Sequence, residues 1–149
     1  MATGRIENIW LKRCKSGPMD AVQQAEMITG KGLDGNADQG GKRQVTLISL
    51  ERWREIEKAL GAEIDFTARR ANILLSGIDL ENSRGKILQL GSCRLLIRGE
   101  TRPCRRMDEA YWGLQDAMRP HWGGGAYAEV LEGGIVTPGE QAAWSDEGE

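Results

Sequence analysis

The sequence is poor in the residues and motifs on which common enzyme classes depend. Its 149 residues include one histidine, His121, and three cysteines that form no CxxC pair. A single histidine gives little basis for a Ser-His-Asp triad, and an odd, widely spaced cysteine set argues against a disulfide framework or a structural zinc site. No GxxxxGK[ST] or GxGxxG loop is present. Hydrolase and nucleotide-binding functions therefore have little support.

No charge of one sign dominates, and no long apolar run occurs. The formal charge of -2 and a pI near 5.6 give no overall attraction to nucleic acid or to an anionic membrane, although a local basic patch remains possible. The sequence "MATGRIENIW" does not resemble a signal peptide, and no segment approaches the length of a membrane span. We expect a cytoplasmic protein that binds neither nucleic acid nor membrane, with its cysteines as free thiols.

Glycine, in contrast, is abundant, with 20 glycines beside 4 prolines. Frequent turns of this kind favour a mainly β fold, and the length suits one domain over residues 1–149, with an acidic tail at about 145–149. Residues 4–13 and 44–50 have strand-like composition, and residues 85–99 predict two strands that turn at Gly91-Ser92. A second hairpin turn is predicted at Gly133-Gly134.

Two segments have helical periodicity instead. Ser49 is expected to cap a helix that ends at Gly61, with Leu50, Trp53, Ile56 and Leu60 on its apolar face. A second helix is predicted over residues 108–118, stopped by Arg119-Pro120. We expect both apolar faces to belong to the core.

Cys104 lies in "TRPCRR", between Arg102, Arg105 and Arg106. Nearby cations favour the thiolate form, which is the nucleophile and the metal ligand, and Pro103 restricts the backbone beside it. The alternative is a buried, unreactive cysteine whose neighbouring arginines point elsewhere. Cys93 lacks such neighbours, whereas Cys14 lies between Arg13 and Lys15; both are interpreted as structural.

Other candidates carry weaker signals. Arg70 and Asn72, in "RRAN", could offer a guanidinium and an amide to a phosphate or carboxylate. His121 precedes three glycines, of which Gly124 could let backbone approach a ligand, although hairpin geometry explains the glycines equally well. The loop "KGLDGNADQGGKR" has the composition of a calcium loop but not the EF-hand spacing, so turn chemistry is its simpler explanation.

Taken in order, the segments "KSGPM", "GKGLDGN", "RQVTLIS", "RRANI", "LGSCRLLI", "RPC" and "EVLEGGIVTPGE" resemble the MOSC domain family, named for the C-terminal domain of molybdenum cofactor sulfurases. The resemblance implies a β-barrel-like domain with two or three short helices that binds the molybdenum cofactor, a molybdopterin-type compound ending in a phosphate. It also implies that Cys104 either ligates molybdenum or carries activated sulfur. Asn36 stands where family members often have aspartate, which makes it a doubtful site residue.

Three functions follow from this resemblance. The first is an oxidoreductase that reduces N-hydroxylated small molecules, with Cys104 as molybdenum ligand and Arg70, Arg102 and Arg105 holding the cofactor's phosphate; Asn72, His121 and Gly124 are further candidate cofactor contacts. Because no iron-sulfur or flavin motif is present, a partner protein would supply electrons. The second is a sulfur carrier whose persulfide on Cys104 comes from a pyridoxal-phosphate cysteine desulfurase; no pyridoxal-phosphate site is expected on this chain. The third is a non-catalytic cofactor-binding module.

Overall fold

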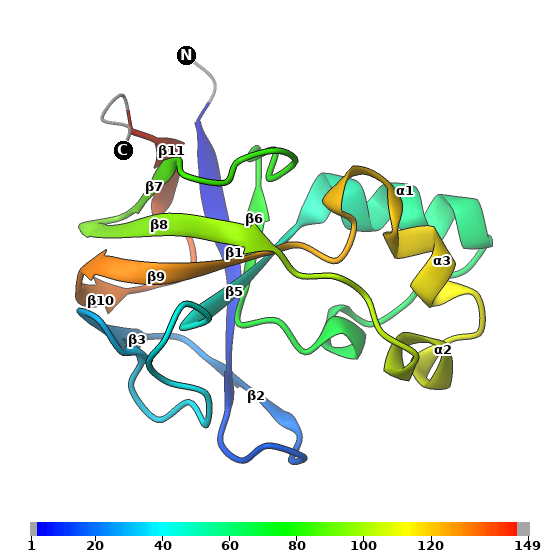
Figure 1. Ribbon diagram of the computed structural model, residues 1–149, viewed down its shortest axis with the longest axis horizontal. Helices are drawn as coiled ribbons and strands as arrows, with labels where there is room; N and C mark the ends of the chain where they lie inside the picture. The colour runs from blue at the N-terminus through cyan, green and yellow to red at the C-terminus, as the bar shows by residue number, and fades with distance from the viewer. Residues whose placement is uncertain (1–2, 146–149) are drawn as a thin grey trace.

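A closed ring of seven strands dominates the computed structural model, which describes residues 3–145. Neighbours pair antiparallel except β5 and β6, which are parallel, and the ring closes where β11 pairs with β1, placing Gly4 opposite Ala142. The ring contains, in spatial order, β11 (Gln141–Trp144), β7 (Ile87–Leu90), β8 (Cys93–Glu100), β9 (Ala126–Glu132), β5 (Val45–Ser49), β6 (Ile73–Ser76) and β1 (Gly4–Lys12). The predicted mainly β, barrel-like fold is confirmed (Figure 1).

Four further strands extend this barrel. The strand β2 (Met19–Val22) pairs with the end of β1. A small separate sheet contains, in order, β10 (Gly134–Val136), β3 (Ala25–Ile28) and β4 (Gly32–Leu33). Together they cover one side of the barrel beside the loop that follows β4 (Figure 1).

The barrel interior is filled by branched aliphatic side chains, which the pleat of each strand directs inward at alternate positions. Ile6, Leu47, Ile73, Leu95 and Ile97 are all fully buried there. Cys93 belongs to the same core, and burial raises the pKa of its thiol. This cysteine is therefore a packing residue.

The first predicted helix is confirmed as α1 (Leu50–Leu60). The Ser49 hydroxyl accepts a hydrogen bond from the Arg52 N–H at 3.2 Å, and Gly61 ends the helix in the left-handed region with φ of 67°. Trp53 and Ile56 are buried on its inner face.

The second predicted helix, over residues 108–118, is wrong as one element. It is two helices, α2 (Arg106–Ala110) and α3 (Leu114–Met118). Tyr111 is extended and Gly113 has φ of 91°, so the chain turns between them. The Asp108 carboxylate stabilises this turn, accepting hydrogen bonds from the Gly113 N–H at 3.2 Å and the Gln115 N–H at 3.0 Å. The predicted stop at Arg119-Pro120 is confirmed.

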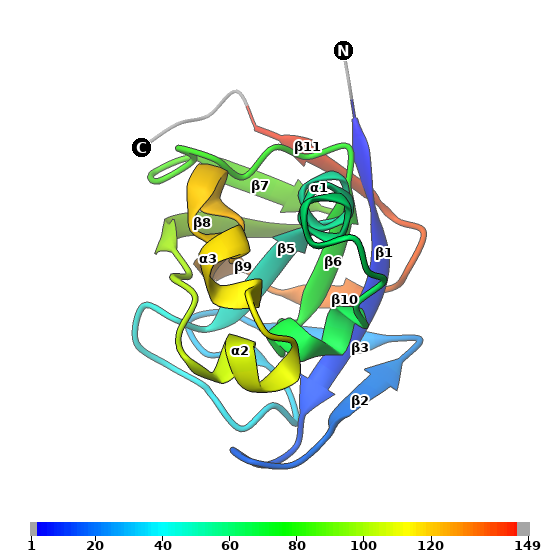
Figure 2. The same ribbon diagram turned by 90° about the vertical axis from the view of Figure 1, so that its right-hand side faces the viewer.

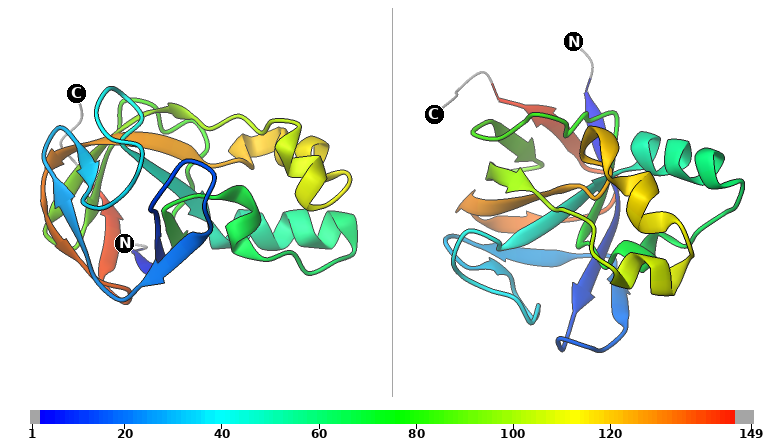
Figure 3. Two further views of the ribbon diagram at one scale, coloured as in Figure 1. Left: turned by 90° about the horizontal axis from the view of Figure 1, so that it is seen from below. Right: turned by 45° about the vertical axis from the view of Figure 1, so that its right-hand side comes forward.

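The helices form a layer at one end of the barrel (Figures 2 and 3). Their own core contains Trp53, Ile56, Ile64, Met107, Leu114 and Met118. Two short 3₁₀ turns, η1 (Phe66–Arg69) and η2 (Pro120–Trp122), complete the layer. The chain crosses from barrel to helices where β8 runs into α2 and returns where η2 leads into β9, so the site described below lies at this junction.

The two predicted hairpins have different outcomes. The turn at Gly91-Ser92 is confirmed, because Leu90 pairs with Cys93. The hairpin at Gly133-Gly134 is wrong: β10 leaves β9 and pairs with β3, with Gly134 opposite Met27. A Cβ on Gly133 would lie 2.2 Å from the Met27 carbonyl oxygen, so this glycine permits a close crossing.

The sequence predicted an acidic tail at about residues 145–149 and no segment long enough to span a membrane. The Ser145 N–H, at the start of the predicted tail, donates a hydrogen bond to the Ile87 carbonyl, whereas residues 146–149 lie outside the described residues. Within residues 3–145, no helix has the length and apolar character that a membrane span requires.

Candidate functional site

Cys104 is exposed on the loop of residues 101–105, the Cys104 loop, which begins at the buried Thr101 and joins β8 to α2. Its carbonyl accepts a hydrogen bond from the Met107 N–H at 2.9 Å, which turns the chain into α2. The alternative of a buried Cys104 is therefore wrong. The thiol is open to solvent and to a ligand or another protein.

A buried guanidinium holds this loop. Arg69, at the end of η1, is only 8% exposed. Its Nε donates to the Gly124 carbonyl at 2.8 Å and its Nη2 to the Thr101 carbonyl at 3.4 Å, and Nη1 lies 3.9 Å from the Met107 Sδ. One side chain thus joins the start of the Cys104 loop and Met107 of α2 to the segment that precedes β9.

The charge on Arg69 has no carboxylate partner within residues 3–145; its hydrogen-bond partners are neutral. Burial lowers the pKa of Arg69 to about 10, Arg43 adds to the decrease, and Cys104 opposes it. Arg43 and Cys104 therefore lie close enough to Arg69 to act on its charge. Since burying an uncompensated cation is costly, this position favours an anion beside Cys104.

A second group of cations lines the surface next to this loop. Lys12, Lys15 and Arg43 line one hollow of about 460 Å³, and Arg70 with Arg106 and Met107 lines another of about 460 Å³. A small polar pocket shares Lys12, Arg43 and Arg70 with them. We call the surface formed by Lys12, Lys15, Arg43 and Arg70 the cationic trough.

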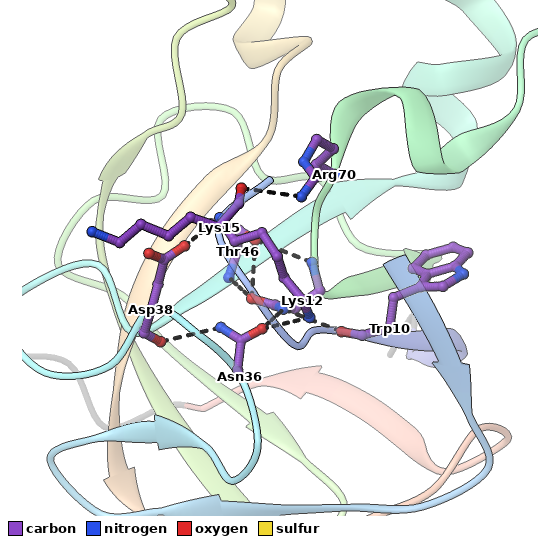
Figure 4. Close-up of polar contacts among 8 residues, drawn as sticks. Trp10, Lys12, Lys15, Asn36, Asp38, Thr46 and Arg70 are labelled. Carbon is purple, nitrogen blue, oxygen red and sulfur yellow. Dashed lines mark hydrogen bonds and ion pairs between the residues drawn. The ribbon is translucent and has the colours of Figure 1, made fainter. Parts of the chain in front are cut away.

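Arg70 is placed in this trough by its backbone. It adopts a left-handed conformation with φ of 60°, which is uncommon for a residue with a side chain. Its Nη2 donates to the Lys15 carbonyl at 3.4 Å (Figure 4). Arg69 and Arg70 therefore face different surroundings although they are adjacent, the first inside the protein and the second at the trough.

Asn72 is buried, and its side chain is fully engaged by the protein. Its Oδ1 accepts hydrogen bonds from the N–H and hydroxyl of Thr46, each at 3.1 Å. Its Nδ2 donates to the Trp10 carbonyl and to Asn36 Oδ1, also at 3.1 Å. Asn72 thus links β6 to β1, β5 and the loop after β4 beneath the trough.

The contacts of Asn36 give a physical reason why asparagine is present where an aspartate was expected. Its Oδ1 accepts from the Lys12 N–H at 2.8 Å, and its Nδ2 donates to the Asp38 carbonyl at 3.1 Å (Figure 4). A carboxylate could make the first contact but has no proton for the second. Asp38 in turn forms an ion pair with Lys12, so the carboxylate of this loop stands two residues later.

Arg102, Arg105 and Arg106 are all exposed around Cys104. None of them forms an ion pair with any residue of the described chain. Together with the cationic trough they make this end of the molecule locally basic. This cluster of basic side chains is a local basic patch of the kind that the sequence permitted, and Asp38 and Glu109 are acidic residues that line the same hollows.

Gly124 lies against the same loop. A Cβ added to it would stand 2.2 Å from the Thr101 carbonyl oxygen and 3.4 Å from Pro103 Cδ. Its lack of a side chain lets the chain before β9 contact the Cys104 loop. The hydroxyl of Thr101 is buried without a hydrogen-bond partner in the described structure, which leaves one polar group of the site unsatisfied.

His121 is placed differently from the other predicted site residues. Its Nδ1 lies 3.0 Å from Glu81 Oε2, in the loop between β6 and β7. His121 belongs to η2, which follows α3 in the chain, and its backbone has φ of 56°. His121 therefore contacts the loop between β6 and β7, whereas the Cys104 loop is held through Thr101 by Arg69 of η1.

Sequence reasoning missed Arg69, Arg43 and Lys12. Arg69 was visible only as the first arginine of "RRAN", and its burial depends on packing against distant segments. Within residues 3–145, no group of three or more histidine, cysteine, aspartate or glutamate residues is placed to hold a metal ion.

Solved structures share this fold. The YuaD protein from Bacillus subtilis superposes with a TM-score of 0.81 at 22% identity, covering 94% of each chain. YiiM from Geobacillus stearothermophilus gives a TM-score of 0.78 at 17% identity, covering 96% of this chain and 75% of that one. YiiM from Escherichia coli gives 0.73 at 16% identity, covering 96% and 70%.

Sequence comparison identifies the family. No curated protein matches the chain. The MOSC domain family, however, matches residues 34–143, a segment that contains Arg43, Arg69, Arg70 and Cys104. The chain therefore belongs to the MOSC domain family.

Proposed function

We propose that this protein binds a molybdenum cofactor at Cys104 and the cationic trough and reduces N-hydroxylated small molecules. The observation that carries the proposal is the exposed Cys104 thiol beside a buried Arg69 cation that has no carboxylate partner in the described chain. A soft thiolate is a suitable ligand for a transition metal. A pterin that ends in a phosphate suits the adjacent guanidinium groups.

The residues present fit such a group. Arg70 and Arg43 line the trough and would hold the phosphate, and Arg102 and Arg105 stand exposed on the same loop as Cys104. The unsatisfied Thr101 hydroxyl offers one further hydrogen-bonding group. When bound, the cofactor would supply a metal that changes oxidation state while the substrate loses oxygen.

The contribution of the chain itself is positioning and electrostatics. Arg69 ties Thr101 of the Cys104 loop to Gly124, which lies before β9, and so helps to hold the sulfur in one place. The cations Arg43 and Arg69 favour anionic groups beside it. Exposure of Cys104 leaves one side of the site open for substrate.

The test is the molybdenum content per chain of wild type and Cys104→Ser, purified from a host that makes the cofactor and measured by elemental mass spectrometry. We expect near-stoichiometric metal in the wild type and little in the variant. Cys14→Ser is the control for loss of an exposed thiol; Cys14 lies between Arg13 and Lys15 in the loop between β1 and β2, so this variant also tests whether a second cysteine beside the trough holds metal. Equal metal in both variants would refute the ligand role of Cys104.

A sulfur carrier is the second candidate, and the exposure of Cys104 is the observation that favours it. In that function a desulfurase persulfide transfers its outer sulfur to the Cys104 thiolate, which becomes the persulfide as the desulfurase thiolate leaves. Cyanide-releasable sulfur after incubation with a cysteine desulfurase and cysteine measures this directly. Sulfur that is lost in Cys104→Ser but kept in Cys14→Ser, in a protein without molybdenum, would favour the carrier.

A further inference from the structure

The turn between α2 and α3 exposes an aromatic pair. Trp112 is 85% exposed and Tyr111 is 38% exposed. In the described chain, Ile135 on β10 is the only other large apolar side chain classed as exposed. Because burying a tryptophan contributes strongly to protein association, a tryptophan left in water at this place requires an explanation.

The turn that carries Trp112 is held in place on both sides. The Asp108 carboxylate binds the N–H groups of Gly113 and Gln115, and the Tyr111 N–H donates to the Met107 carbonyl at 3.0 Å. Met107 and Leu114, before and after the turn, are buried in the helical core. The backbone at Trp112 is therefore ordered before any partner arrives, which lowers the entropic cost of binding.

This aromatic pair lies close to the reactive loop. Helix α2 has five residues and is about 8 Å long at 1.5 Å per residue. Cys104 stands just before it and Tyr111 just after it. A protein seated on Trp112 would therefore reach the Cys104 loop.

Three arginines before this pair have no ion-pair partner in the described chain, and Asp108, Glu109 and Asp116 are the acidic residues of the same two helices. Arg105 and Arg106 begin α2, Arg102 precedes them, and none has an ion-pair partner in the described chain. Glu109 is the acidic neighbour on the exposed side of α2, and Asp116 of α3 pairs with Arg119. Arginine and tryptophan are the residue types most enriched where protein partners bind tightly. The whole chain is acidic, with a net charge of -2, so an acidic partner would be attracted to this face in particular.

We propose that Trp112, Tyr111 and the arginines Arg102, Arg105 and Arg106 form the docking surface for an acidic one-electron carrier protein. The identity of this partner rests on the proposed reductase function. Reduction of a hydroxylamine to an amine and water consumes two electrons and two protons. Two reduced carriers, docking in turn, would each become oxidised by one electron, and solvent would supply the protons.

The experiment compares two reductants with the cofactor-loaded protein and phenylhydroxylamine as substrate. Reduced methyl viologen is a small molecule that needs no docking surface, whereas a reduced acidic [2Fe–2S] ferredoxin does. In Trp112→Ser we expect the ferredoxin-dependent kcat/KM for aniline formation to fall about tenfold or more, with the viologen-dependent rate unchanged within about twofold. Ile135→Ser, which removes the exposed apolar side chain of β10, is the matched control and keeps both rates.

Ionic strength gives a second test of the charge argument. Raising salt from about 50 mM to about 300 mM shortens the screening length and should slow the ferredoxin-dependent reaction several-fold more than the viologen-dependent one. An equal loss with both reductants in Trp112→Ser, or an unchanged ferredoxin rate, overturns the docking surface.

Binding without turnover separates this proposal from the proposed function. Titration of the protein with oxidised ferredoxin, followed by calorimetry, should give a Kd that rises about tenfold in Trp112→Ser. If the wild type reduces no substrate even with viologen but the titration shows this difference, the reductase function fails and the docking surface stands. If Trp112→Ser instead converts a dimer to a monomer without changing the Kd, the surface binds a second copy of this chain and the proposal is wrong.

Discussion

At the scale of single residues, the site depends on the different positions of Arg69 and Arg70. Both belong to "RRAN", which indicates a guanidinium near a strand start without saying which one is buried. Arg69 is buried because the carbonyls of Thr101 and Gly124, from distant parts of the chain, converge on it. No local pattern contains that information, whereas the cations beside Cys104 were visible because they are its sequence neighbours.

Replacing Arg69 tests whether its charge or its fork of hydrogen bonds matters. We expect Arg69→Met to lose most of the bound molybdenum. The variant should remain folded, because removing a buried charge that is costly to desolvate offsets the loss of its hydrogen bonds. Arg69→Lys keeps the charge without the planar fork and should retain more than about half of the metal. Elemental analysis and urea unfolding measure the two effects. A folded Met variant with full metal content would contradict this role.

At the scale of elements, the helical layer shows where periodicity succeeds and where it fails. The first helix was predicted with both ends because Ser49 and Gly61 are local capping signals. The second was predicted as one helix because its apolar spacing continues through residues 111–113, yet Gly113 and the Asp108 carboxylate break it. The hairpin predicted at Gly133-Gly134 was wrong for a similar reason. Gly133 permits a close approach to Met27 of β3 and does not form a hairpin turn.

Asp108 should therefore stabilise the turn that carries Trp112. In Asp108→Ala the N–H groups of Gly113 and Gln115 lose their acceptor, and we expect the free energy of unfolding to fall by about 1 kcal/mol. Urea unfolding measures this change. Glu109→Ala is the control, because Glu109 is exposed and makes no hydrogen bond in the described structure. If the two variants are equally stable, the turn does not depend on this carboxylate.

At the scale of the whole molecule, the stability of the fold should depend on acid through Glu57. Burial alone would raise the pKa of Glu57, but the Arg54 guanidinium and the Ile64 N–H, each at 2.7 Å, hold it below its usual range. A carboxyl with a lowered folded pKa stabilises the protein above its unfolded pKa of about 4.3. That contribution disappears as the pH falls through the lower, folded value.

We expect wild type to lose stability more steeply than Glu57→Gln as the pH decreases from about 5 to about 3, the range in which an unperturbed and a lowered carboxyl titrate. Thermal unfolding at a series of pH values gives both slopes. Glu55→Gln, which removes an exposed carboxyl of the same helix that pairs with Arg52, is the control for loss of a negative charge alone. Parallel curves for wild type and Glu57→Gln would show that this carboxyl titrates alike in both states.

The closure of the barrel through β1 and β11 has a consequence for synthesis. The strand β1 is synthesised well before β11 and finds this neighbour only when residues 141–144 have followed it. Until then β1 keeps one unpaired edge, which is where strands of other chains can add. Pairing between strands this far apart in the sequence also has a high loop-closure cost, and such topologies fold slowly. Nascent chains of this protein should therefore depend on chaperones until β11 emerges, long after the segment bearing Cys104 has been made.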